Sequence, residues 1–503
     1  MRSWSPFKPL GLIVLVAIAL GTAHAQAECT PDTTLRAATI DMPVNMDPAF
    51  AELYASMQVY QHIFAKVVEL GIDYEILPNI AERWTQDSET AWTFHLVADA
   101  TFHDGEPVTA HDVKYSIDRV LDPEVGASNA IFLAPITGVE VVDDHTVRIH
   151  VEEGWGGLLQ ALAAVGDVVS QRAIESLDPR LEPVGAGPYR MVDWVQGDHV
   201  LLARHEGYHG PRPHFDCIEM RAVSEDAVRQ TGLVTGEFGW VEQVPLQRAA
   251  ALQQDGAVRY HPGGPYLPDI IMFNNSRPPF DDVRVRQAVA WALDRDAIAN
   301  IVFFGQAMPA TEAISDLSPL YTGIDPYADG PDFERARALV EEAGAVGATV
   351  VFAGQPQVAT AFRTGQLLQE QLRQIGLEVE IVSHEPAQWF EALFTGNFDF
   401  TITFWSATID PEHMYYPLLH SSSPWNFPRF ESAAVDEALD AFRYTSDPDA
   451  RAEAYRGVVD AVAAEVPILF TTNKFIGYWT APQLIGATPR PSLELRLDLI
   501  RPE

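Results

Sequence analysis

The chain has 503 residues, with 70 Asp and Glu against 33 Lys and Arg, so its formal net charge is -37 at pH 7. So acidic a surface repels nucleic acid and anionic lipid and argues against either as a partner. Hydrophobic residues make up 47% of the chain, as in ordinary globular proteins, and the length predicts two or three lobes.

The first 27 residues resemble an export signal. Arg2 and Lys8 precede an apolar run over 10–20, which is shorter than a membrane span. Small residues at 23, 25 and 27 offer cleavage sites, so we expect residues 1–27 to be removed; the alternative is a retained anchor. Cleavage removes two positive charges and no acid, which moves the charge from -37 to -39. Glu28 precedes Cys29 where a lipoprotein signal needs a small residue, so we predict a soluble periplasmic protein that is not a lipoprotein.

The first half of the chain alternates strands, turns and short helices. Thr109 and Asp112 form a capping box at the start of a helix with core positions Val113 and Ile117, which ends at the Asp-Pro pair 122–123. Alternation and turn residues also predict strands over 34–40, 91–96, 191–194 and 200–204, a hairpin over 139–151, and a helix over 56–68.

The chain contains two cysteines, Cys29 and Cys217. An even count in an oxidising compartment favours a disulfide. Cys29 precedes one predicted strand and Cys217 opens another over 217–223, so neighbouring positions in one sheet would bring the two sulfurs together. The alternative is two separate thiols.

The second half alternates longer helices with apolar strands. Helices are predicted over 283–293, 333–343, 361–375 and 388–394, and strands over 377–382 and 398–404. Gly376 fits the C-cap of the third helix. This alternation predicts an α/β unit with a covered, mostly parallel sheet.

Four blocks of sequence, in order, carry a family resemblance. They are FHDGEPVTAHDVKYSIDRVLDP at 102–123, VGAGPYRMVDWVQGDHVLLARHEGYHG at 184–210, IIMFNNSRPPFDDVRVRQAVAWALDRDAI at 270–298 and FDFTITFWSATIDP at 398–411. Together they resemble the dipeptide, oligopeptide and nickel solute-binding proteins of ABC importers, bacterial extracellular solute-binding protein family 5. The resemblance extends over nearly the whole mature chain.

The resemblance implies an α/β bilobal periplasmic-binding-protein fold with two hinge crossings. Lobe I would use 28–268 plus 477–503, with an inserted subdomain at about 72–182, and lobe II would use 269–476. The crossings would lie near 267–273 and 474–479. A solute would bind in the cleft between the lobes, which would close around it and then dock on a membrane permease. We expect a monomer.

One catalytic pattern competes with this interpretation. His205-Glu206-Gly207-Tyr208-His209 matches HExxH, which in zinc peptidases places both histidines on one helical face with the glutamate as general base. Gly207 and the Gly-Pro pair at 210–211 oppose a helix, so we interpret the run as a surface loop. No other catalytic or cofactor-binding signature is present, so we predict neither catalytic residues nor a cofactor.

The ligand is expected where the apolar strand 398–404 ends in a polar loop, the usual position in α/β sheets. Trp405 would wall the pocket with an apolar face. In peptide receptors of the family, an aspartate three residues after the matching tryptophan pairs with the ligand ammonium. Here that position is Thr408, whose hydroxyl cannot replace an ion pair. The candidates in this segment are Phe404, Trp405, Ser406, Thr408 and Asp410, although Asp410 also fits a cap for a helix beginning at Pro411.

Further candidates lie elsewhere in the chain. Arg363 stands near an arginine that holds the ligand carboxylate in dipeptide receptors, and it would open a helix whose free amides favour an anion. An exposed helical arginine is the alternative. Asn45, Phe50 and Tyr54 follow the first strand, and Tyr415 follows the Trp405 loop; each could line the cleft or belong to the core.

The sequence therefore predicts a non-catalytic receptor for a small peptide or peptide-like solute. Because Thr408 replaces the expected acid, a non-peptide organic solute such as an opine or sugar is the alternative. A chelated metal near His413, His420 and His384 comes next, with solvated or capping histidines as the ordinary interpretation. A secreted zinc peptidase is the rival from another class.

Overall fold

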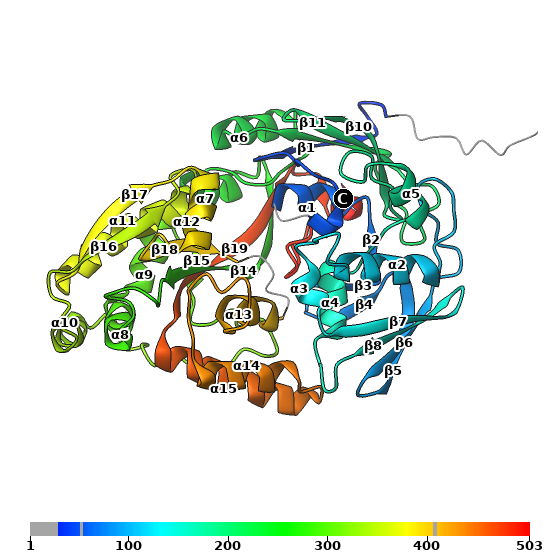
Figure 1. Cartoon of the computed structure of the whole chain (residues 1–503). Helices are drawn as coiled ribbons and strands as arrows, with labels where there is room; N and C mark the ends of the chain where they lie inside the picture. Colours follow the sequence, from blue (N-terminus) through cyan, green and yellow to red (C-terminus); the bar gives the residue numbers. More distant parts are fainter. Residues whose placement is uncertain (1–28, 51–53, 406–409) are drawn as a thin grey trace, which may run out of the picture.

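The computed structural model describes residues 29–50, 54–405 and 410–503, and eleven of its strands form one long sheet (Figure 1). In order across the sheet they are β10 (Tyr189–Val195), β11 (His199–Arg204), β12 (Cys217–Ala222), β1 (Thr34–Thr39), β13 (Trp240–Val241), β19 (Ile468–Thr480), β14 (Arg259–Phe273), β18 (Phe400–Phe404), β16 (Thr349–Gly354) and β17 (Glu378–Ser383), with β15 (Ala307–Pro309) added on β19.

Lobe I is the half of the sheet from β10 to β13 with the helices packed on it. β1 pairs in parallel with both β12 and β13. Side chains alternate across β1: Leu35 packs with Val59 of α1 (Tyr54–Tyr60) on one face. Ala38 packs on the other face, with Leu233 of α6 (Asp226–Thr235) and Leu252 of α7 (Leu246–Asp255). Helices on both faces therefore bury this half-sheet.

Two long strands join the halves of the sheet. β14 and β19 pair antiparallel from Arg259 opposite Thr480 to Met272 opposite Ile468. β13 pairs with β19 at the lobe I end, whereas β18 pairs with β14 at the other end. Both segments in which we expected the chain to cross between lobes fall within these two strands.

Lobe II is built on β18, β16 and β17, which are parallel to one another. One face is covered by α8 (Val283–Ala292), α10 (Phe333–Glu342) and α11 (Ala359–Gln374). The other face is covered by α12 (Pro386–Thr395), α13 (Glu412–Leu419), α14 (Ala433–Arg443) and α15 (Pro448–Glu465). The predicted α/β class with a covered sheet is confirmed. The prediction of a mostly parallel sheet holds for β18, β16 and β17 alone, because β18 pairs antiparallel with β14, and β14 pairs antiparallel with β19.

A separate four-stranded antiparallel sheet forms the inserted subdomain. Its order is β5 (Ala81–Ser88), β6 (Ala91–Leu96), β8 (Thr146–Val151) and β7 (Ile136–Asp143), and it packs with α2 (Ala110–Leu121), α3 (Ala130–Leu133) and α4 (Leu158–Val165). The predicted capping box begins α2, where the Thr109 amide donates to the Asp112 carboxylate at 3.0 Å. In Figure 1, α3 and α4 face α13 of lobe II.

The predicted helix over 56–68 is wrong in its second half. α1 ends at Tyr60, and the chain continues into β2 (Ala65–Lys66), which pairs with β9 (Asp167–Val168), and then into β3 (Val68–Leu70). Ile63 and Phe64 pack in the core of lobe I, whereas Val67 and Val68 pack in the core of the inserted subdomain. Because this run contributes apolar side chains to two cores, apolar residues recur at short intervals along it. Some of these intervals match the spacing of a buried helical face, which is why the pattern predicted a longer helix.

The predicted disulfide is confirmed. Cys29 and Cys217 are bonded, with 5.5 Å between their Cα atoms. Thr34 lies opposite Cys217 in the parallel pair of β1 and β12, so the turn before β1 brings Cys29 back onto the end of β12. The bond ties the beginning of the described chain to the sheet of lobe I.

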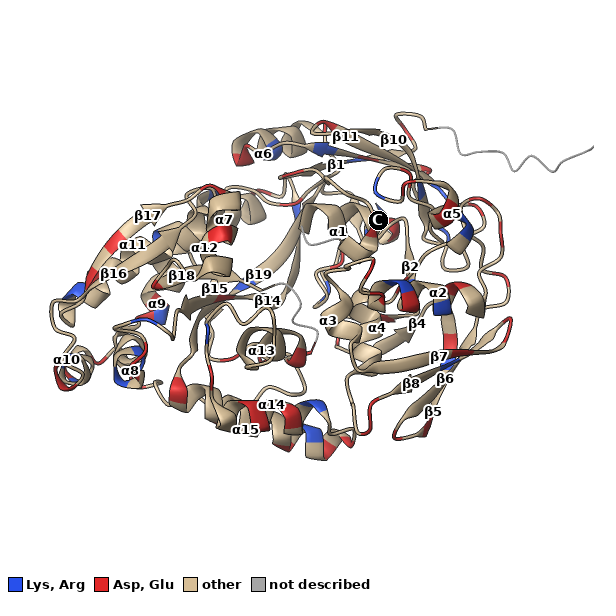
Figure 2. Cartoon of the chain, viewed as in Figure 1, with Lys and Arg blue, Asp and Glu red and all other residues tan. Residues whose placement is uncertain are grey.

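The predicted export signal lies outside the described residues, which begin at Cys29. Within the described ranges, no helix is both long enough and apolar enough to cross a bilayer. Acidic residues are spread over both lobes and the inserted subdomain (Figure 2).

Candidate functional site

The carboxyl ends of two parallel strands bring an acid to the inner edge of lobe I. β1 and β13 pair at Ala37–Trp240 and Ala38–Val241, so Ile40 and Glu242 emerge side by side. Glu242 Oε2 accepts a hydrogen bond from the Ile40 amide at 2.8 Å. This edge of an α/β sheet is where ligands usually bind.

Three side chains from other elements lie near Glu242. They are Tyr54 and Gln58 of α1 and Tyr478 of β19. Burial is the main cause that raises the pKa of Glu242, and the Ile40 amide and the more distant Arg229 oppose it. Burial and the Glu242 charge together raise the pKa of Tyr54 to about 12.

Glu242 has no ion-pair partner within 4.0 Å in the described part of the chain, although its carboxylate is partly buried. Arg229, the cation that affects its pKa, is fully buried and instead donates to the carbonyls of Val223 and Gln243 and pairs with Asp226. A partly desolvated carboxylate with only neutral donors attracts a cation. We call Glu242, Tyr54, Gln58 and Tyr478 the acidic cluster.

A second group lies farther along the hinge strands, toward lobe II. Lys474 Nζ lies 2.9 Å from Asp269 Oδ1 and 4.4 Å from the ring centre of Phe404. Asp269 is buried, and burial raises its pKa while Lys474 lowers it. Phe404 ends β18 with 37% of its side chain exposed, so an aromatic face remains open beside a cation.

One residue of each group lies on β19. Lys474 and Tyr478 are four residues apart on β19 and therefore point to the same side of it. At the usual rise of a strand their Cα atoms are about 13 Å apart. The hinge thus presents an acid near one end of this span and a lysine at the other.

The structure places the segment around Trp405 beside lobe II helices. Trp405 Nε1 donates to the His413 carbonyl at 3.1 Å, and its ring meets Trp425 edge-on at 6.0 Å between centres. Ser406 and Thr408 lie outside the described residues. Trp405 is half-buried, so part of its surface stays open.

Asp410 and Tyr415 are placed inside lobe II. Asp410 is 1% exposed, accepts from the Glu412 amide at 2.9 Å, and pairs with Arg451 at 2.8 Å. It is not the N-cap residue we expected, because α13 begins at Glu412 and Pro411 occupies that position. Tyr415 is also 1% exposed and packs in the core of lobe II, where its hydroxyl accepts from the Ala313 amide at 3.3 Å. Neither side chain is available to a solute in this arrangement, which corrects both expectations.

The remaining candidates lie in different parts of the molecule. Arg363 does not open its helix: α11 begins at Ala359, so the amide of Arg363 lies beyond the free first turn, and its side chain is exposed. Asn45 Oδ1 accepts from the Asp47 amide at 2.8 Å. Phe50 is half-buried at the end of a 3-10 turn, and Tyr54 belongs to the acidic cluster.

The sequence did not identify Glu242, Gln58 or the side chain of Lys474 as candidate site residues. β13 is only two residues long, too short for any alternation to mark the acid that follows it as a strand-end residue. Lys474 was recognised only as the beginning of a hinge crossing. A search for acids directly after short apolar pairs would have found Glu242.

The HEGYH run forms a loop, as expected. His205 Nδ1 faces the Gly187 carbonyl at 3.3 Å, whereas His209 Nε2 faces Asn79 at 3.0 Å. Glu206 pairs with Arg204 at 2.8 Å and with Arg212 at 2.7 Å. These side chains do not converge on one point.

The three histidines that we considered as metal ligands also have different surroundings. His413 is buried against Phe132, with 5.2 Å between ring centres, and His420 stacks on Tyr416 at 4.4 Å. Across residues 29–50, 54–405 and 410–503, no group of three or more His, Cys, Asp or Glu side chains is arranged to hold a metal ion. His384 follows β17, and its amide donates to the Gly354 carbonyl.

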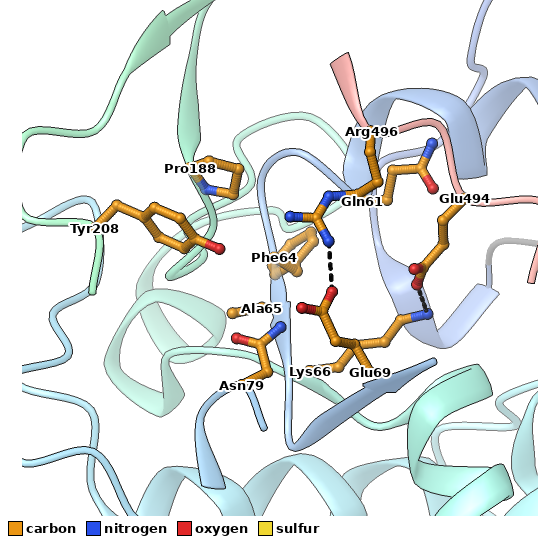
Figure 3. A pocket seen from close by; sticks show the side chains of 10 residues that line it. All are labelled: Gln61, Phe64, Ala65, Lys66, Glu69, Asn79, Pro188, Tyr208, Glu494 and Arg496. Carbon is orange, nitrogen blue, oxygen red and sulfur yellow. Dashed lines mark hydrogen bonds and ion pairs between the residues drawn. The ribbon is translucent and has the colours of Figure 1, made fainter. Parts of the chain in front are cut away.

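A small, partly open cavity of about 30 Å³ lies elsewhere, at the base of the inserted subdomain (Figure 3). Its charged lining is already paired: Lys66 Nζ bonds Glu494 at 2.6 Å, and Arg496 bonds Glu69 at 2.5 Å. A space of this size suits one or two water molecules. The cavity therefore fits a structural role and not that of a solute site.

A family model supports the resemblance. The model described as "Bacterial extracellular solute-binding proteins, family 5 Middle" matches residues 75–426. The glutathione-binding protein GsiB of Salmonella typhi is 27% identical over 462 residues, covering 87% of this chain and 90% of that protein. GsiB of Escherichia coli O157:H7 is 26% identical over the same length.

Solved structures agree on the fold. The periplasmic binding protein AgaA of A. tumefaciens R10, in complex with agropinic acid, superposes with a TM-score of 0.83 at 26% identity, covering 93% of this chain and 99% of that one. DppA of Helicobacter pylori, in complex with the peptide STSA, gives 0.83 at 20% identity and covers 93% and 98%. NikZ of Campylobacter jejuni, in complex with Ni(L-His), gives 0.83 at 20% and covers 94% and 100%.

Proposed function

Since this chain belongs to the bacterial extracellular solute-binding proteins of family 5, we propose that it captures a small zwitterionic solute, peptide or peptide-like, between its lobes. Its role is that of a receptor for an ABC importer, as in its family. The proposed part concerns which solute is bound and which side chains hold it.

Glu242 carries this proposal. The carboxylate stands at the ligand edge of lobe I, is held by the Ile40 amide at 2.8 Å, and is partly withdrawn from water. A primary ammonium on the solute would supply the missing cation and hydrogen-bond donors. Glu242 then performs from lobe I the task that the family's aspartate performs at the position of Thr408 in this chain.

Lys474 provides the opposite charge. A solute carboxylate at this end of the span would share the ammonium of Lys474 with Asp269, and an apolar part of the solute would lie on Phe404. An extended peptide of three or four residues covers a length similar to the roughly 13 Å between the Cα atoms of Lys474 and Tyr478, the β19 residues of the two groups. This arrangement favours tripeptide-sized zwitterions over sugars, which lack both charges.

The remaining expectations follow from family membership. We propose cleavage of residues 1–27 and release into the periplasm without a lipid anchor. We also propose that the mature protein is a monomer without enzymatic activity, which delivers its solute to an inner-membrane permease. The lobe boundaries stated above, 28–268 with 477–503 and 269–476, and the insert at about 72–182 remain part of this proposal.

The test compares defined probes by isothermal titration calorimetry. Reduced glutathione and trialanine are titrated with and without an N-acetyl cap, against the wild-type protein, Glu242→Gln and Glu237→Gln. Glu237 is an exposed acid five residues before Glu242 and serves as the matched control.

We expect the uncapped probes to bind and the cap to weaken binding tenfold or more, because it removes the ammonium. Glu242→Gln should reproduce that loss for uncapped probes, and Glu237→Gln should leave binding unchanged. Equal affinity for capped and uncapped probes would contradict the role of Glu242.

A further inference from the structure

A glycine-rich loop of the inserted subdomain reaches lobe II. Residues 152–157, Glu-Glu-Gly-Trp-Gly-Gly, connect β8 to α4. Trp155 is 0% exposed, and its ring belongs to the core of the subdomain. We call residues 152–157 the tryptophan loop.

The indole of Trp155 bonds an acid of lobe II. Nε1 lies 3.2 Å from both Oε1 and Oε2 of Glu412, the first residue of α13. The Glu412 carboxylate also lies 3.3 Å from Arg443 and 3.4 Å from Arg451. A donor from the subdomain is therefore built into a charged network of lobe II.

Two further hydrogen bonds flank this contact. The Tyr444 hydroxyl, just after α14, donates to Glu152 Oε2 at 2.7 Å. The Gly156 amide donates to the Arg443 carbonyl at 3.4 Å. Three donor–acceptor pairs thus join one six-residue loop to the last residue of α14, to Tyr444 after it and to α13.

The glycines of the tryptophan loop are required by this approach. A Cβ on Gly156 would stand 2.6 Å from the Thr445 carbonyl oxygen and 2.9 Å from Arg451 Cδ. The nearest atoms to a Cβ at this position all belong to lobe II. A side chain larger than hydrogen would therefore separate the subdomain from lobe II without disturbing the subdomain itself.

The subdomain is fastened to lobe I by different contacts. Arg119 of α2 pairs with Asp47, with 3.0 Å between Nη1 and Oδ1, and Asn129 donates to the Pro48 carbonyl at 2.8 Å. Thr101 Oγ1 donates to the Gly207 carbonyl at 3.2 Å. Because these bonds and two chain connections hold it to lobe I, rotation of lobe II about β14 and β19 would separate the tryptophan loop from α13.

We propose that the tryptophan loop is an intramolecular latch: it engages Glu412 and Tyr444 when the lobes close, and it holds part of the population closed even without solute. The inserted subdomain then acts as a second closing surface, outside the solute site. Phe132 of α3 extends the contact by packing edge-on against His413 and Trp425.

The charged groups around Glu412 are consistent with a reversible contact between Glu412 and Trp155. Asp410, Arg443 and Arg451 face its carboxylate from lobe II, and Trp155 faces it from the subdomain. Burial and the Asp410 charge raise the pKa of Glu412 to about 7, while the two arginines and the indole oppose the rise. Opening would return water to this carboxylate, which offsets the bonds that are lost.

The test measures distances between lobes in solution by double electron–electron resonance. Spin labels are attached at Glu89→Cys in the subdomain and Glu453→Cys on α15, both exposed. Bound solute is first removed by unfolding in guanidinium and refolding with the native disulfide intact. The parent is compared with Gly156→Ala, Tyr444→Phe and the control Gly138→Ala, whose added methyl would meet open space in β7 of the same subdomain.

We expect the parent to show a population at the distance of the structure and a second, longer one. Gly156→Ala should shift the distribution to the longer distance, Tyr444→Phe should do so in part, and Gly138→Ala should leave it unchanged. A parent without the shorter population, or a distribution that neither Gly156→Ala nor Tyr444→Phe alters, would overturn the proposal. Because no solute is present, the result is independent of the solute assignment, and Tyr444→Phe keeps the test decisive if Gly156→Ala fails to fold.

Discussion

At the scale of single residues, we propose that the acid which binds the solute ammonium lies on lobe I. By resemblance, the family's ammonium-binding aspartate corresponds to Thr408 here, and in our proposal Glu242 supplies the carboxylate instead. The change is chemically consistent, since a cleft between two lobes has two walls and a charge can be supplied from either. It also explains why reading one motif alone left the solute class open.

The raised pKa of Glu242 gives a prediction about pH. An acid whose pKa is raised by burial is protonated at a higher pH than an exposed glutamate, and its protonated form cannot pair with an ammonium. The affinity for glutathione or trialanine should therefore begin to fall at a higher pH than the protonation of an exposed glutamate would cause. Titration calorimetry between pH 7.5 and 5 checks this.

The matched experiment uses Glu242→Gln, which should bind weakly and with little pH dependence over the same range. If the variant retained the pH profile of the wild-type protein, the titrating group would be elsewhere.

At the scale of elements, the sequence predicted long regular segments well and short ones poorly. α8, α10 and α11 carry a sustained helical period and cap residues, so their positions followed from pattern alone. β2, β3 and β13 have two or three residues each and are fixed by tertiary pairing, so no local signal marks them. The acidic cluster depends on one of these short strands, which is why the site was only partly predicted.

The disulfide allows an element-scale prediction. It links Cys29 to Cys217 across 188 positions of sequence, and closing so long a loop restricts the unfolded chain. Removing it should lower the free energy of unfolding by about 3–5 kcal/mol. Thermal unfolding of Cys29→Ser/Cys217→Ser should show a lower Tm, with β1 and β12 becoming less protected in hydrogen exchange.

Exchange protection of β16 and β17 in lobe II, which the disulfide does not touch, provides the internal control. Equal protection of β1 and β12 in both proteins would show that the bond does not stabilise lobe I.

At the scale of the whole molecule, we expect a buried histidine and a half-buried one to make lobe I sensitive to acid. His62 Nε2 accepts from the Leu497 amide, and burial lowers its pKa from 6.5 to about 4. His103 joins the inserted subdomain to the Gly185–Gly187 loop, and burial lowers its pKa to about 3. Both side chains are neutral in the folded protein and protonated in the unfolded chain below pH 6.5.

The unfolded state therefore binds more protons, and stability is lost as the pH falls from 6.5 toward 4. For His62 alone the loss at pH 5 is about 2 kcal/mol. Tm measured by calorimetry should decrease by a few degrees between pH 7 and pH 5. In His62→Gln, which keeps an acceptor for the Leu497 amide, the decrease should be smaller.

The same pH dependence in His62→Gln and in the wild-type protein would assign the acid sensitivity to other groups. The comparison is made on Tm differences within each protein, so any constant effect of the substitution cancels.

The bilobal arrangement could be predicted from the sequence, because four sequence blocks occur in the same order as in the family. The contact between the tryptophan loop and α13 could not, since Trp155 and Glu412 are 257 positions apart and neither lies in a recognisable pattern. Only the folded arrangement shows that the inserted subdomain touches both lobes.

Native mass spectrometry of the mature protein purified from the periplasm, followed by denaturation and identification of the released small molecule, shows which solute the cleft holds. We expect a solute of tripeptide size that carries both a primary ammonium and a carboxylate. A released sugar, or any solute without a cationic nitrogen, would contradict this expectation.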